Sequence, residues 1–137
     1  MNNFELNKIL KDFNCNPPVI ANDIVVFQAS NNITLPQEYV DFLKVSDGGE
    51  GFIGQNSYVI FWKLNELMKL NDAYQVRNYA DKLFLFGSNG GGEAFAFDTR
   101  QKPYTIVSVP FVGMDMELIE TIGKTFWEFL EFLYDVE

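Results

Sequence analysis

Histidine is absent from this 137-residue chain, and cysteine occurs only once, as Cys15. The missing histidine removes the most common general base near neutral pH and the most common zinc ligand, which excludes many enzyme classes. A single cysteine cannot form a disulfide within the chain, as is typical of proteins in a reducing cytoplasm. No apolar run approaches the ~20 residues of a membrane helix, and the first ten residues do not resemble a secretory signal. We therefore expect a cytoplasmic protein without a membrane partner.

Basic residues are also scarce, with 10 lysines and arginines against 19 acidic residues and a net charge of −9. The basic residues are scattered singly, so no positive patch offsets the repulsion of phosphate backbones, and we do not expect nucleic-acid binding. The acidity instead suits a basic protein partner. Apolar residues make up 47% of the chain and aromatic residues 16%, which is ample for one packed domain spanning residues 1–137.

The apolar periodicity predicts a single α+β domain, with helices first, then a mainly antiparallel sheet, then a closing helix. A helix capped by Asn2 or Asn3 is expected to end before residues 14–18, and residues 75–81 are expected to form a loop or the end of the helix that precedes them. The segment 22–29 favours a strand by its β-branched residues and a helix by its capping residues. The other predicted helices span about 36–45, 64–74 and 125–135, the last capped by Thr121 or Thr125, and the predicted strands span 52–53, 58–62, 83–86, 94–98 and 104–110.

Four glycines fall within residues 87–92, between two apolar runs. Gly87 and Gly92 have the spacing of a phosphate-binding loop, but Glu93 and Ala94 stand where that loop has lysine and a hydroxyl residue. A carboxylate there would repel phosphate, and a strand-like alternation follows in place of a helix. The pattern therefore predicts the turn of a β-hairpin.

Other constellations give no convincing catalyst. Asp47, Glu50 and Glu93 would bind calcium only if two loops met, and the spacing of a calcium loop is missing. The carboxylates of Asp115, Glu117 and Glu120 allow acid–base chemistry in principle but are more typical of a solvated face. The serines lack a histidine partner. We predict no catalytic residue, no metal and no cofactor.

Several segments, in order, resemble the SUKH superfamily of bacterial immunity proteins and fungal cell-wall-synthesis regulators. The run LPQEYVDFLKVSDGGEG (residues 35–51) is similar to its Leu-Pro-x-x-Tyr-x-x-Phe-Leu and Asn/Asp-Gly-Gly signature. LFLFGSNGGGEAFAFD (83–98), IVSVP and the final TFWEFLEFL match its later strands and closing helix. The resemblance is clearest over residues 20–135.

The resemblance implies a strongly bent sheet flanked by helices, and a helix before the Leu-Pro motif, which favours helix for 22–29. It also implies structural roles for the signature residues, which start and anchor a helix or permit turns. These residues are Leu35, Pro36, Tyr39, Leu43, Gly48, Gly49, Gly91 and Gly92.

By this resemblance, the chain is expected to be a non-enzymatic immunity protein that binds and blocks a cognate toxin domain, such as a nuclease or another nucleic-acid-modifying enzyme. The alternative is an intracellular scaffold or regulator of the cell-wall-synthesis type with a non-toxin protein partner. Exposed acids and loop residues are the predicted contact surface. They are Asp47, Glu50, Ser88, Asn89, Glu93, Asp98, Asp115 and Glu117.

Overall fold

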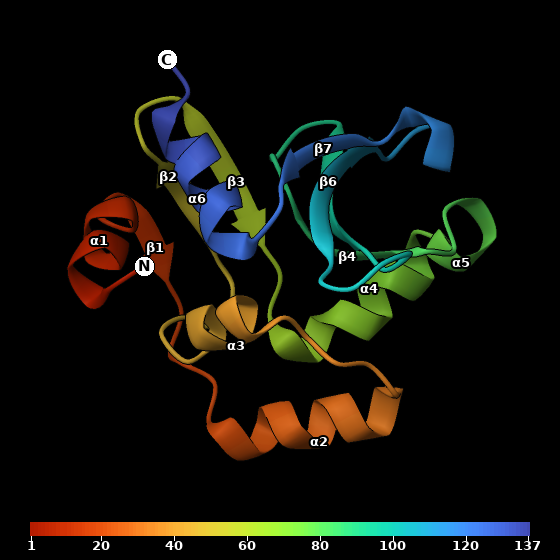
Figure 1. Cartoon of the computed structure of the whole chain (residues 1–137), viewed down its shortest axis with the longest axis horizontal. Helices are drawn as coiled ribbons and strands as arrows, with labels where there is room; N and C mark the ends of the chain where they lie inside the picture. Colours follow the sequence, from red (N-terminus) through yellow and green to blue (C-terminus); the bar gives the residue numbers. More distant parts are fainter.

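The computed structural model describes residues 1–137 as six α-helices, two 3₁₀ helices and one antiparallel sheet (Figure 1). The helices are α1 (Asn3–Ile9), α2 (Ala21–Asn31), α3 (Gln37–Leu43), η1 (Leu64–Glu66), α4 (Leu67–Ala73), α5 (Val76–Tyr79), η2 (Met116–Leu118) and α6 (Phe126–Asp135). The strands are β1 (Phe13–Cys15), β2 (Gly49–Ile53), β3 (Ser57–Phe61), β4 (Leu83–Ser88), β5 (Glu93–Asp98), β6 (Thr105–Pro110) and β7 (Glu120–Gly123). The predicted α+β class is confirmed.

The sheet is narrow in its middle. Its strands follow the chain order from β1 to β7, so each strand pairs with the next one. β3 and β4 share only the pairs Ile60↔Ser88 and Phe61↔Gly87, whereas β5 and β6 pair along their whole length. Figure 1 shows β2 and β3 running at a steep angle to β4 and β6. The predicted bent sheet, flanked by helices, is therefore confirmed.

An aromatic cluster fills the core between the sheet and the helices α3 and α6. The Tyr39 ring lies 5.6 Å from that of Phe86, 5.1 Å from Phe97 and 5.3 Å from Phe126, between ring centroids. Burial raises the pKa of the Tyr39 phenol, whose hydroxyl has no hydrogen-bond partner in the protein. Leu35 and Leu43 are also buried. These three signature residues therefore lie in the core.

Asn71 of α4 supplies the hydrogen-bond partners of Leu85 in β4, beyond the last residue pair that β4 forms with β3. Its Nδ2 donates to the carbonyl oxygens of Leu85 at 2.9 Å and Leu67 at 2.8 Å. The Leu85 amide donates to Asn71 Oδ1 at 2.9 Å. One buried side chain therefore satisfies both backbone groups of Leu85, which buried polar groups require.

The segment Ser46–Gly49 ties three elements together. Gly48 has a φ of +65°, and a Cβ there would lie 2.4 Å from the Phe61 carbonyl oxygen. The buried Ser46 hydroxyl accepts from the Asn16 amide at 3.0 Å and donates to the Gly48 carbonyl. The carboxylate of Asp47 accepts from the Leu64 amide at 2.8 Å, at the start of η1. The Asp-Gly-Gly signature is thus a structural junction.

The structure settles three choices that the sequence left open: the conformation of residues 22–29 and the residues that cap the first and last helices. Residues 21–31 form α2, so the strand alternative for 22–29 is wrong; only Ile24 of this helix is buried. Asn2 caps α1 by accepting from the Glu5 amide at 2.9 Å. Thr125 caps α6 by accepting from the Glu128 amide at 3.1 Å, whereas Thr121 lies in β7.

Four elements were not predicted: β1, β7, the single turn α5 and the 3₁₀ helix η2. β1 and β7 have three and four residues, too short to show a strand alternation, and they become strands by pairing with β2 and β6. The predicted loop 75–81 contains the single turn of α5, which begins after Gln75 at a φ of +54°. Tertiary pairing, which local sequence does not encode, accounts for the two short strands.

The glycine-rich turn joins β4 and β5 as a hairpin, as predicted, with the Asn89 amide donating to the Glu93 carbonyl at 3.0 Å. The left-handed conformation belongs to Gly90, at a φ of +77°. Gly91 and Gly92 lie in the same turn, but neither adopts a positive φ, and a Cβ on Gly92 would meet nothing within 4 Å, so the turn does not require glycine at position 92.

No helix in this fold combines the length and the apolar character that crossing a membrane would need.

Candidate functional site

A groove of about 470 Å³ opens between the glycine loop, the strands β5–β7 and the second half of α6. We call it the hairpin groove, and Asn89 and Glu93 lie at its glycine-loop side. Its full lining is Asn56, Ser57, Tyr58, Asn89, Glu93, Phe95, Ser108, Glu120, Ile122, Phe132 and Leu133. The lining mixes aromatic, amide and carboxylate side chains and contains no lysine or arginine.

The register of the sheet gathers the carboxylates on one face. Phe95 pairs with Ser108, and Ser108 pairs with Glu120, so these three side chains share a face. Glu93 stands two residues before Phe95 and therefore points to the same face. The groove thus presents Glu93 and Glu120 above a floor that includes Phe95, and no ion pair neutralises either carboxylate.

Tyr58 links the groove to the outer face of β2. Its ring lies against the glycine loop, because a Cβ on Gly90 would come within 3.1 Å of Tyr58 Cδ1. Its hydroxyl donates to the Glu50 carboxylate, and this hydrogen bond raises the pKa of the Tyr58 phenol. Phe52 packs edge-on against the same ring at 5.3 Å. An acidic and aromatic surface therefore continues from the groove across β2 and β3.

Glu50, Ser88, Asn89 and Glu93, of the eight predicted contact residues, lie at or beside this surface. Ser88 is buried, however, and its Oγ accepts from the Gly90 amide at 3.1 Å, so its predicted exposure is wrong. The exposed Asn89 uses its Oδ1 in the loop itself, accepting from the Gly91 amide at 2.8 Å.

The other four predicted contact residues occupy different places. Asp115 and Glu117 are exposed in the connection between β6 and β7, where Asp115 caps η2 by accepting from the Glu117 amide at 2.9 Å. That connection starts beside the glycine loop, since the Phe111 amide donates to the Gly92 carbonyl at 2.9 Å. Asp47 is partly buried at η1, and Asp98 lies at the far end of β5 from Glu93.

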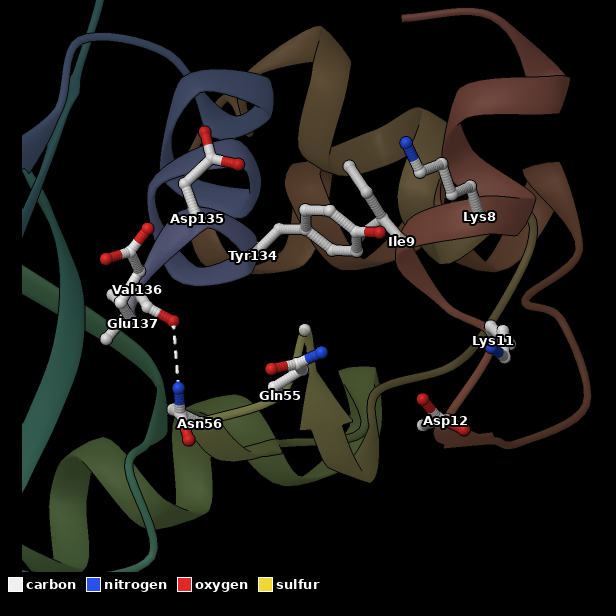
Figure 2. A pocket seen from close by; sticks show the side chains of 11 residues that line it. Lys8, Ile9, Lys11, Asp12, Gln55, Asn56, Tyr134, Asp135, Val136 and Glu137 are labelled. Carbon is white, nitrogen blue, oxygen red and sulfur yellow. Dashed lines mark hydrogen bonds between the residues drawn. The ribbon is translucent and has the colours of Figure 1, made fainter.

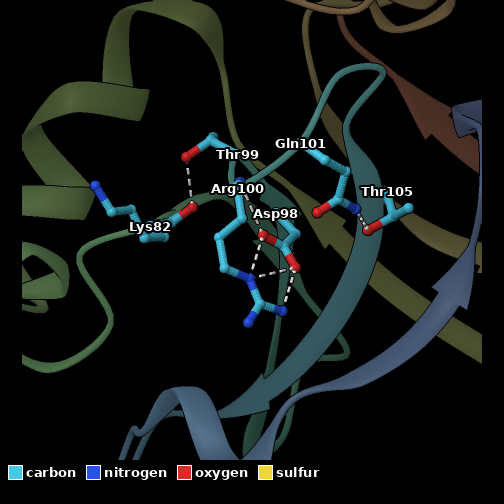
Figure 3. Close-up of polar contacts among 6 residues, drawn as sticks. All are labelled: Lys82, Asp98, Thr99, Arg100, Gln101 and Thr105. Carbon is cyan, nitrogen blue, oxygen red and sulfur yellow. Dashed lines mark hydrogen bonds and ion pairs between the residues drawn. The ribbon is translucent and has the colours of Figure 1, made fainter.

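Asp98 was predicted to be exposed and is instead 2% exposed, so that expectation is wrong. Its carboxylate forms the chain's one ion pair, with Arg100 Nη2 at 2.7 Å from Oδ2 (Figure 3). It also accepts from the Arg100 backbone amide at 3.1 Å. These hydrogen bonds hold the pKa of the Asp98 carboxyl below its usual range and raise the pKa of Arg100. Asp98 therefore fixes the turn between β5 and β6.

We expect Asp98→Asn to lower the free energy of unfolding at neutral pH by about 1 kcal/mol, since Arg100 is half exposed and water screens the pair. The folded pKa lies below the unfolded one, so this contribution is complete above about pH 4 and disappears as the pH falls through the folded pKa. Urea unfolding at a series of pH values checks this. Asp72→Asn, at an exposed position, is the control; a wild-type-to-D98N difference that persists undiminished at low pH would contradict the assignment.

A second hollow of about 610 Å³ lies between α1, the turn after β2 and the end of α6 (Figure 2). Its lining includes Lys8 and Lys11 together with Asp12 and Asp135, so it has no single sign of charge. Lys8 Nζ lies 5.5 Å from the centre of the Tyr134 ring. These contacts join α1 to α6, and the hollow lacks the uniform charge of the hairpin groove.

Sequence reasoning did not assign Tyr58, Glu120 or Phe132 to a contact surface. Phe132 is 50% exposed and stands outside the stripe of Phe126, Leu130 and Leu133, which was a readable signal on a helix. Glu120 was considered only as a member of a carboxylate pair. Its place in the groove depends on β7, which was not predicted. No three acidic or cysteine side chains gather in a cluster that could hold a metal ion, so Asp47, Glu50 and Glu93 do not meet.

A comparison with protein families identifies the chain. The sequence model of the SMI1/KNR4 family (SUKH-1) matches residues 18–131, from the approach to α2 to the middle of α6. The chain belongs to the SMI1/KNR4 family (SUKH-1). A search of curated proteins found no match to the chain.

The SUKH-1 match includes the Asp-Gly-Gly junction, the glycine loop and most of the hairpin groove. It ends just before Phe132 and Leu133, which close the groove from α6. The resemblance seen in the sequence is thus confirmed, and the residues that carried it now have positions. Two of them, Tyr39 and Leu43, are buried in the core, and Gly48 and Gly49 lie where a Cβ would meet neighbouring atoms. The groove is bordered by Asn89 and Glu93.

Proposed function

We propose that this SUKH-1 chain is a non-enzymatic immunity protein, which binds a cognate toxin domain in the cytoplasm and blocks it. The observation that carries the proposal is the hairpin groove, with its unpaired Glu93 and Glu120 and no basic residue in its lining. Family membership is consistent with this role. Occlusion of a toxin requires a complementary surface and no catalytic group of its own.

The partner we propose is basic, as a nuclease or another nucleic-acid-modifying enzyme is where it contacts phosphates. Asp98 is the only one of the 19 acidic residues that forms an ion pair, so the negative field of the chain is largely uncompensated. Such a field raises the association rate with a basic partner and makes that rate fall with salt. Once the acidic face of this chain covers the basic surface of the toxin, the toxin can no longer reach its own substrate.

The test uses a toxin domain encoded beside this chain, co-expressed with it in a host that the toxin kills. We expect the wild-type chain to restore growth and to inhibit the purified toxin at a stoichiometry of about one to one. Glu93→Lys with Glu120→Lys should slow association at least about tenfold and flatten its salt dependence. Glu128→Lys with Glu131→Lys, on the exposed face of α6, makes the same charge change and should have a much smaller effect.

A toxin that stays fully active in the complex, or growth that is not restored, would contradict the immunity role. A stable complex with a protein that has no toxic activity would favour the scaffold or regulator alternative.

A further inference from the structure

The sheet ends at β7, and no strand covers the outer edge of β7 (Figure 1). Such an edge presents unpaired backbone N–H and C=O groups, which proteins normally block because they pair readily with another chain. β7 pairs only with β6 in this fold. No strand therefore uses its outer side, and α6 packs against β7 at Gly123, where a Cβ would lie 2.9 Å from the Phe129 nitrogen.

The two edges of the sheet differ in how they are blocked. At the other edge, β1 has only three residues, and Pro17 and Pro18 follow shortly after it. Proline has no backbone N–H to donate, so Pro17 and Pro18 limit the length of chain along which another strand could pair at that edge. β7, Glu120–Gly123, is also short, but it contains neither proline nor lysine, and its one charged residue, Glu120, repels an acidic segment and attracts a basic one. This edge is left available.

Charge around β7 decides which occupant fits. Asp115 and Glu117 stand in the connection that leads into the strand, and Glu120 is its first residue. All three are exposed. A second copy of this chain would place its own acidic edge against these carboxylates, which costs free energy, whereas a basic segment is attracted.

The hairpin groove lies beside this edge and provides a place for a side chain. Glu120 lines the groove with Glu93 and Phe132. Side chains of a strand added to β7 would alternate between the two faces of the sheet. Every second side chain would thus point to the groove face. An arginine or lysine there could lay its carbon stem on the Phe132 ring and place its charge near the carboxylates of Glu120 and Glu93.

We propose that β7 binds an extended, basic segment of a protein partner as an eighth strand, with one basic side chain seated in the hairpin groove. This rests on the proposed function, because the partner is the toxin domain. Strand addition gives affinity through main-chain hydrogen bonds, and the groove adds selectivity for a basic residue.

The probe is a capped peptide, (Arg-Val)₄, added to the ¹⁵N-labelled full chain and followed by NMR. We expect amide shifts at Thr121, Ile122 and Gly123 and at groove residues. (Arg-Pro)₄ has the same charge but cannot pair as a strand, and (Glu-Val)₄ has the opposite charge; neither should shift the β7 amides. Glu120→Lys should weaken (Arg-Val)₄ binding about tenfold, while Glu131→Lys, the same change on the outer face of α6, should change it less than about twofold.

Equal shifts with (Arg-Val)₄ and (Arg-Pro)₄, or equal losses from both lysine variants, would mean unspecific charge attraction and would overturn strand addition. Dimerisation of the free chain through β7, seen as concentration-dependent shifts at the same amides, would assign the edge to a second copy and overturn the proposal too. The two proposals can be separated. Toxin neutralisation unaffected by Glu120→Lys contradicts this inference alone, whereas β7-specific peptide binding without neutralisation contradicts only the immunity role.

Discussion

Asn71→Leu is expected to lower the free energy of unfolding by about 3 kcal/mol, although leucine has a similar volume and is apolar. The substitution leaves the amide and carbonyl of Leu85 without their partners in a buried site, since the Asn71 side chain supplies both. β3 cannot replace it, because its pairing with β4 stops at Phe61 and Gly87. The loss of stability therefore comes from two buried backbone groups left without hydrogen-bond partners, and it exceeds the gain from the added apolar surface.

Urea unfolding measures the effect, and hydrogen exchange of the Leu85 amide locates it. Asn78→Leu makes the same chemical change at an exposed position in α5 and should alter the free energy of unfolding by no more than about 0.5 kcal/mol. If Asn71→Leu proved as stable as the wild type, β4 would have found another partner, and Asn71 would not be the residue that completes this strand.

Gly48→Ala is expected to cost more than about 3 kcal/mol or to prevent folding. The new Cβ would lie 2.4 Å from the Phe61 carbonyl oxygen and 2.6 Å from the Trp62 carbonyl oxygen, and both are backbone atoms. Neither can rotate away as a flexible side chain would. Relief requires moving the end of β3, where the sheet is narrowest.

Two other glycines separate the causes. Gly113 also has a positive φ, at +72°, but a Cβ there would meet nothing within 4 Å, so Gly113→Ala should show only the conformational cost of about 1 kcal/mol. Gly92→Ala has neither problem and should be neutral or slightly stabilising. In thermal melts, the melting temperature should be lowest for Gly48→Ala, higher for Gly113→Ala and highest for Gly92→Ala. A Gly48→Ala protein as stable as Gly113→Ala would show that the close approach to β3 is relieved at little cost.

Elements with a strong local signal were predictable from the sequence. The stripe on α6, the capping Thr125, and the helix that begins after Pro36 all depend on residues near one another in the chain. The α2 helix needed the family resemblance, because its exposed Val25 and Val26 favour a strand locally. Local patterns therefore placed the main elements, and family likeness settled an ambiguous one.

The parts that sequence reasoning missed depend on partners distant in the chain. Asn71 gives no local sign that it will complete β4, and β7 is too short to be read before its pairing with β6 is known. Asp98 was placed on the surface because acids usually lie there, yet Arg100 two residues later was a signal of pairing. In the candidate site, Asn89 and Glu93 were predicted and Phe132 could have been read from its position outside the α6 stripe, whereas Tyr58 and Glu120 required the three-dimensional arrangement.

The strictly sequential order of the strands has a kinetic consequence. The pairs β2–β3, β4–β5, β5–β6 and β6–β7 join strands linked by a short connection, so the entropy lost on closing each of these loops is small, whereas η1, α4 and α5 lie between β3 and β4. Pairing of β1 with β2 is different, because α2 and α3 lie between them in the chain. Folding is thus expected to begin in the β4–β6 meander, whose contacts are the most local, and the amino-terminal strand should join late.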